Sequence, residues 1–139
     1  MSAALLAADI ERLLDGSPFI KFMNLQLESF DEAREEITLK MPMRPEFERA
    51  PGTGQFHGGP VSALIDTTGD FAVVLAVKAP VPTINFRVDF LRPCVGSFLV
   101  CTARNRRVGR TVAIVDIEVF DEQSRLCAIG RGCYSAIAG

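Results

Sequence analysis

The fold of this chain is decided by residues 54–77, which read GQFHGGPVSALIDTTGDFAVVLAV. The run is apolar on nearly every side of a helix, which predicts a buried helix that begins near residue 58 and ends before Pro80. Pro60 suits its first turn, where a missing N–H costs little. Asp66 and Asp70 nevertheless stand inside it. A carboxylate in a helix core must be partnered, protonated or open to a cleft, so the pair is either a solvated stripe or a functional site.

The start of this helix carries the only histidine of the chain, His57, followed by Gly58 and Gly59. Free backbone N–H groups and the positive end of the helix dipole converge there, and glycines let a ligand come close to them. Such a site can polarise a carbonyl oxygen as an oxyanion hole does. Asp66 follows His57 by nine residues, between two and three turns along, and is expected to hold a water near the same carbonyl.

The flanking sequence predicts an α+β domain in which an antiparallel sheet wraps around the long central helix. An N-terminal helix is expected over 2–15, with Ser2 as N-cap and Gly16 as the stop. Two extended stretches follow, and then a loop rich in proline and glycine. Four strands with period-two alternation fill the last sixty residues. The ranges are 20–30 and 33–42 for the extended stretches, 43–56 for the loop, and 83–93, 98–108, 110–120 and 126–138 for the strands.

Length and composition indicate one domain over 1–139. The chain is 48% hydrophobic with a net charge of −2, so nothing global points to nucleic acid or to a membrane surface. No signal peptide is visible, since acidic residues interrupt the N-terminal apolar segment. The four cysteines form no CxxC and no pattern with His57, so no metal site is expected, and free thiols suit the cytoplasm. They are Cys94, Cys101, Cys127 and Cys133.

Two segments together carry a family resemblance. HGGPVSALIDTTGDFA, at 57–72, is similar to the HGG-x-x-x-x-L-x-D-x-x-x-x-x-A signature of hotdog-fold thioesterases of the phenylacetate-degradation (PaaI-like) type. TINFRVDFLRP, at 83–93, resembles the strand that follows the central helix in that family. The resemblance covers about residues 18–137 and implies the hotdog fold, in which a sheet wraps a central helix. It also implies hydrolysis of an acyl- or aryl-CoA thioester, with coenzyme A as part of the substrate and no other cofactor.

The resemblance assigns roles to four positions. Asp66 corresponds to the general base or nucleophile, and the Gly59 amide, beside Gly58, to the group that polarises the thioester carbonyl. His57 corresponds to the residue that orients the thioester. Thr83 corresponds to a hydroxyl that holds the attacking water. The sequence departs from the family at Pro51, where relatives often have an asparagine, and Gln55 is a candidate replacement. Asp70 is expected to be structural or to contact a second subunit.

The ligand's other parts have their own candidate residues. Phe56 is a candidate for the acyl pocket. Five arginines are candidates for the coenzyme A phosphates, because guanidinium groups match phosphate geometry; the alternative is an ordinary solvated turn. They are Arg92, Arg104, Arg106, Arg107 and Arg110. Open sheet edges invite pairing, so a homodimer or a homotetramer built as a dimer of dimers is expected, with sites shared between subunits.

Two other functions remain open from the sequence. A non-catalytic acyl-CoA-binding protein would need the groove and the arginines but not Asp66. A hotdog hydratase or dehydratase would use a histidine with an acid on an enoyl thioester, and His57 is the candidate for that role.

Overall fold

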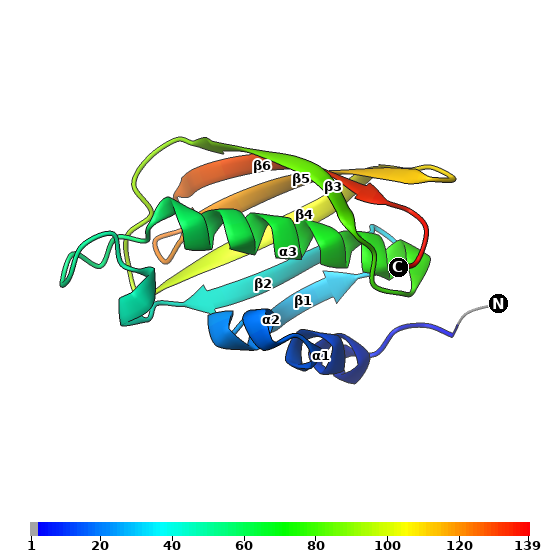
Figure 1. The fold of residues 1–139 in the computed structure, drawn as a ribbon, viewed down its shortest axis with the longest axis horizontal. Helices are drawn as coiled ribbons and strands as arrows, with labels where there is room; N and C mark the ends of the chain where they lie inside the picture. The colour runs from blue at the N-terminus through cyan, green and yellow to red at the C-terminus, as the bar shows by residue number, and fades with distance from the viewer. Residues whose placement is uncertain (1–2) are drawn as a thin grey trace.

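The computed structural model describes residues 3–139, in which a six-stranded antiparallel sheet wraps around one long helix (Figure 1). The strand order is β1-β2-β4-β5-β6-β3, so β1 and β3 form the two edges. The helices are α1 (Ala7–Gly16), α2 (Pro18–Met23) and α3 (Gly58–Val77), with a short 3-10 turn at Pro45–Phe47. The strands are β1 (Gln26–Asp31), β2 (Glu36–Pro42), β3 (Thr83–Phe90), β4 (Phe98–Val108), β5 (Val112–Asp121) and β6 (Leu126–Ser135). The α+β prediction is confirmed.

The core lies between α3 and the concave face of the sheet. Alternate residues of β2, β4 and β5 point inward and are buried, as Cys101 and Ala103 of β4 and Val115 and Val119 of β5 illustrate. Ten residues of α3 are buried against them. By length and mean hydropathy α3 also resembles a membrane span, as a helix enclosed in a protein core does. Removal of this apolar surface from water is the main force that holds the helix in the sheet.

The N-terminal helix begins later than the sequence predicts. Residues 3–6 are not helical, and Ser2, the expected N-cap, lies outside the described residues. The first turn is instead fixed by Asp9, whose carboxylate accepts a hydrogen bond from the Leu6 N–H at 2.8 Å. The Leu5 N–H donates a hydrogen bond to Glu32 Oε1 at 2.7 Å, which holds residues before Ala7 in a non-helical conformation.

The extended stretch expected over 20–30 is only partly a strand. Its first residues belong to α2, which Pro18 starts and the Ser17 side chain caps by accepting from the Ile20 N–H at 3.3 Å. Proline at the first helical position after a serine cap favours this turn. The strand β1 begins at Gln26. Together α1 and α2 cover one side of α3 beside β1 (Figure 1).

Candidate active site

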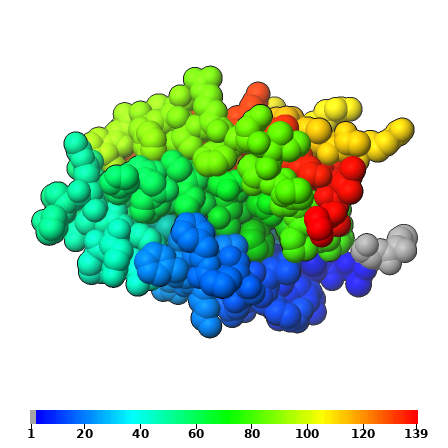
Figure 2. All heavy atoms as spheres, in the orientation of Figure 1, coloured from blue at the N-terminus to red at the C-terminus, as the bar shows by residue number. Residues whose placement is uncertain are grey.

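The two aspartates lie on the face of α3 that the rest of the molecule leaves uncovered. The exposed and half-buried positions of the helix up to its fourth turn recur at intervals of three and four residues and so form one stripe. They are Gly58, Gly59, Pro60, Ser62, Ala63, Asp66, Thr67 and Asp70. In Figure 2 this part of α3 is visible between the N-terminal helices and β3. Both carboxylates therefore lie on the partly exposed face of the helix and not in the core.

Asp66 is held from two sides. The Thr83 hydroxyl, at the start of β3, donates a hydrogen bond to Asp66 Oδ1 at 2.7 Å. The Tyr134 hydroxyl, from β6, donates to the Asp66 backbone carbonyl at 2.9 Å. Burial raises the pKa of Asp66, and the hydrogen bond from Thr83 partly opposes the shift. A carboxylate with a raised pKa, fixed by a hydroxyl on the partly exposed face of a helix, is suited to accept a proton from water.

Tyr134 is a positioning residue that the sequence analysis missed. It is fully buried, and it reaches α3 because Gly69 and Gly132 carry no side chain; a Cβ at either position would collide with the phenol. The signal was present in the chain's single tyrosine and in a glycine set inside an otherwise apolar helix. Neither feature reveals the other until the strand and the helix are packed together.

Asp70 has a different environment from Asp66. Among residues 3–139, no side chain donates a hydrogen bond to its carboxyl group and no cation forms an ion pair with it. Burial and the nearby charge of Asp66 raise the pKa of Asp70 to about 7, against a weaker opposing contribution from the Val81 backbone N–H. The Asp70 carboxyl group is therefore partly protonated near neutral pH.

The helix start is organised by His57. This residue is the N-cap of α3, and its Nδ1 accepts a hydrogen bond from the Gly59 N–H at 2.9 Å. Its own N–H donates to the Phe47 carbonyl at 2.7 Å, which ties the loop to the helix. At Gly58, a Cβ would lie 3.2 Å from Cζ of Phe90, so β3 packs closely against this turn. The Gly59 amide that the resemblance assigns to a carbonyl is thus bonded to the imidazole, which a ligand carbonyl would have to replace.

The two halves of the expected centre are far apart within one chain. Gly59 and Asp66 are seven residues apart on a continuous helix, which corresponds to about 10 Å along its axis. That both groups act on one carbonyl therefore stays a prediction, and the spacing favours the form of it in which the site is shared between subunits.

A hollow of about 390 Å³ lies beside the start of α3. It brings together four residues that the sequence analysis proposed for ligand binding: Gln55, Phe56, Gly58 and Arg92. Phe56 is itself buried in the core, so it forms the floor of this hollow. Arg49, from the preceding loop, also lines this hollow, and the sequence did not single it out. Pro51 lies exposed at a turn of the same loop.

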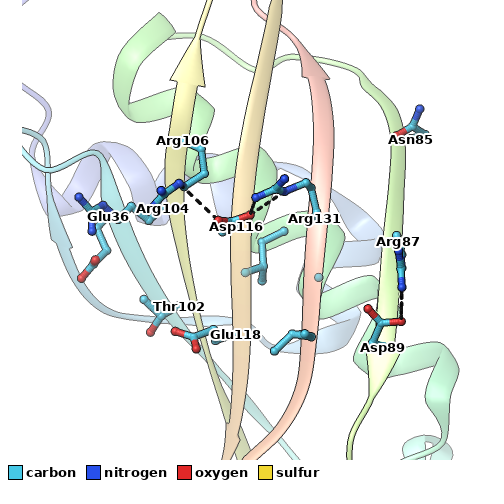
Figure 3. A pocket seen from close by; sticks show the side chains of 13 residues that line it. Glu36, Asn85, Arg87, Asp89, Thr102, Arg104, Arg106, Asp116, Glu118 and Arg131 are labelled. Carbon is cyan, nitrogen blue, oxygen red and sulfur yellow. Dashed lines mark hydrogen bonds and ion pairs between the residues drawn. The ribbon is translucent and has the colours of Figure 1, made fainter.

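The remaining arginines lie elsewhere. Arg104 and Arg106 alternate along β4 with the inward-facing Ala103 and Asn105, so they point to the outer face of the sheet, away from α3. There they line a groove of about 780 Å³ (Figure 3). Arg106 pairs there with Asp116 at 3.4 Å. The groove contains four arginines and four acids, so its charge is balanced. Arg107 and Arg110 are exposed near the β4–β5 turn. Within one chain, Arg104 and Arg106 are thus separated from Asp66 by the sheet.

Comparisons with known proteins agree with this fold. The family model of the thioesterase superfamily matches residues 53–128. The chain is 31% identical to the acyl-coenzyme A thioesterase PaaI of Escherichia coli over 86% of this chain and 82% of that protein. It is 34% identical to a Halobacterium salinarum protein, provisionally named an esterase, over 92% of this chain and 90% of that protein.

The structure of E. coli PaaI superposes with a TM-score of 0.81 over 96% of this chain and 94% of that one, at 24% identity, which supports the fold. The matched family residues include the start of α3 and both of its aspartates. The chain belongs to the thioesterase superfamily and is a PaaI-like protein with the hotdog fold.

Proposed function

We propose that the protein hydrolyses acyl-CoA thioesters to a free acid and coenzyme A, with Asp66 as the general base. The observation that carries the proposal is the Asp66 carboxylate, fixed by Thr83 on the open stripe of α3 with its pKa raised by burial. In the proposed step, Asp66 takes a proton from water as the water oxygen attacks the thioester carbon. The C–S bond then breaks, and the departing thiolate takes the proton that Asp66 holds, which restores the carboxylate. A thiolate leaves readily, so one base and a polarised carbonyl suffice.

A second copy of the chain is proposed to complete the site. A carbonyl bound at one chain's Gly59 lies beyond the reach of the same chain's Asp66, about 10 Å away along α3. The edge strand β3 begins at Thr83, next to Asp66, and its apolar side chains are uncovered in the single chain: Ile84 is 55% exposed and Phe90 53%. Pairing through this edge would cover both side chains. It would also bring another copy close to Asp66.

Coenzyme A is proposed to lie along the hollow at the start of α3. Arg92 and Arg49 line that hollow and can form charge-assisted hydrogen bonds with phosphate. Leu91 and Phe90 add an apolar wall suited to the uncharged arm of the cofactor. The hairpin arginines Arg107 and Arg110 remain candidates for the same phosphates, supplied by a neighbouring subunit.

The test is a panel of saturated acyl-CoA and aryl-CoA thioesters of increasing length, with release of free thiol followed by a chromogenic reagent. We expect turnover on part of this panel. Binding of coenzyme A thioesters without thiol release on any member would favour the non-catalytic alternative. Hydration of an enoyl-CoA without thiol release would favour the hydratase alternative.

A further inference from the structure

A cavity of about 330 Å³ continues the open stripe of α3 beyond Asp70. It lies between α3 and the α1–α2 pair, and most of its lining is apolar, with Leu13 from α1, Ile20 from α2 and Val74 from α3. Cavities of this size and character hold small ligands or parts of larger ones. Phe71 and Pro80 add to its wall.

The position of the cavity relates it to the proposed reaction centre. Asp66, Asp70 and Val74 follow one another at intervals of four residues, so they lie on one face of the helix. Asp66 is the proposed base at the reacting carbonyl, and Asp70 and Val74, one and two turns further along, both line the cavity. An acyl chain that leaves the carbonyl along α3 therefore passes Asp70 before it enters the cavity. Side chains four residues apart on a helix are separated by about 5–6 Å, which matches the fifth carbon of an extended acyl chain.

We propose that Asp70 is a specificity-determining residue that donates a hydrogen bond to an oxygen on about the fifth carbon of the acyl chain, so that the enzyme prefers oxygen-substituted acyl-CoA thioesters over unsubstituted ones. The inference rests on the proposed hydrolysis of acyl-CoA.

The chemistry around Asp70 agrees with this role. With a pKa raised to about 7, a large share of the Asp70 carboxyl group is protonated at neutral pH and can donate its O–H. The titratable groups around it are Asp66 on α3, Arg12 on α1 and the phenol of Tyr134 on β6, which stays neutral because burial raises its pKa. Arg12 is paired with Asp9 at 3.2 Å and its side chain is largely exposed, so it does not neutralise Asp70. The Val81 N–H donates to the Asp70 carboxyl group, but the carboxyl O–H donates to no acceptor among residues 3–139, so a ligand oxygen can receive it.

The test compares two thioesters of equal length, hexanoyl-CoA and 5-oxohexanoyl-CoA, whose ketone oxygen accepts but does not donate. For the wild type, kcat/KM is expected to favour the oxo substrate about tenfold near pH 6, the value of one well-placed hydrogen bond. That ratio should fall as pH rises to 8, because Asp70 loses its proton. Asp70→Asn keeps an N–H donor, so its ratio should remain above one and be independent of pH. Asp70→Leu should reverse the preference, since the ketone then faces only apolar groups.

The ratio separates recognition from general damage, because a loss shared by both substrates cancels. Asp15→Leu makes the same change at an exposed aspartate of α1 and should retain the wild-type ratio and its pH dependence. Equal ratios in the wild type and in Asp70→Leu, with both thioesters hydrolysed, would overturn this inference and leave the proposed function standing. Absence of thiol release from either thioester and from the whole panel would overturn the proposed function and the inference together.

Discussion

Asp66 and Asp70 lie one turn apart on the same helix face, yet their surroundings give them different properties. Asp66 accepts a hydrogen bond from Thr83, which favours its charged form. Asp70 has no comparable side-chain donor among the described residues, and the charge of Asp66 further disfavours its ionisation. The first is therefore suited to act as a base and the second to act as a proton-bearing donor.

The raised pKa of Asp70 makes the stability of the protein depend on pH. The folded state holds this proton up to about pH 7, whereas the unfolded chain releases it near the ordinary value of 3.8. The contribution to stability is therefore complete below that ordinary value and is lost as pH rises through 7. Asp70→Asn removes the dependence, so the variant should gain stability relative to the wild type, on the order of 2 kcal/mol between pH 5 and 8. Urea unfolding across this range measures it; parallel curves for both proteins would contradict the assignment.

The sequence predicted these residues unevenly. The two aspartates could be singled out because a charged residue is conspicuous in an otherwise apolar helical sequence. The resemblance placed Thr83 with Asp66, which the hydrogen bond between them supports. The Gly59 amide was expected to be free, but a single histidine side chain caps it. That bond depends on the rotamer of His57, which spacing along the chain does not specify.

At the scale of elements, the contact between α3 and β6 depends on Gly69. A methyl group there would meet the Tyr134 hydroxyl and, at 2.8 Å, Cδ1 of Ile117. Gly69→Ala is therefore expected to destabilise the fold by about 1–3 kcal/mol, although alanine favours helices. Chemical denaturation with Gly16→Ala as control checks this, since a Cβ at Gly16 meets nothing within 4 Å. Equal unfolding midpoints in the two variants would show that the contact is not tight.

The loop around the start of α3 and the β4–β5 turn offer competing sites for the coenzyme A phosphates. Replacing both Arg49 and Arg92 with alanine should raise KM several-fold and leave kcat nearly unchanged. This is the pattern expected when an interaction stabilises the ground state and the transition state equally. The effect should shrink at high salt. The matched pair is Arg107→Ala with Arg110→Ala, which should have the smaller effect. A larger rise in KM in the Arg107→Ala, Arg110→Ala variant would assign the phosphates to the β4–β5 turn.

Elements with strong local signals were predicted well. The helix 58–77 and the β4–β5 and β5–β6 turns agree with the sequence because apolar periodicity and glycine or polar turn residues specify them locally. The N-terminal region was predicted less well, because Glu32, distant in sequence, binds the Leu5 N–H and sets where the helix begins. Such a partner is invisible to a local pattern.

At the scale of the molecule, the β3 edge is the surface on which the proposed two-subunit site depends. We expect a homodimer, with a dimer of dimers at higher order, in light scattering at micromolar concentration. Ile84→Lys places a charge among the exposed apolar side chains of this edge and should shift the mass toward the monomer while thioesterase activity falls. Lys40→Arg, on β2, is the control and should leave the mass unchanged. A stable and fully active wild-type monomer would remove the shared site.

Asp66 carries the central claim, and replacing it with asparagine tests that claim most directly. Asp66→Asn keeps the volume of the side chain and a group that Thr83 can bond, but it removes the basicity. On the best acyl-CoA, kcat should fall by about two to four orders of magnitude, the scale for loss of a general base. KM should change much less, and the fold should be at least as stable, because a partly buried carboxylate becomes a neutral amide. Wild-type kcat in a folded Asp66→Asn variant would contradict the account.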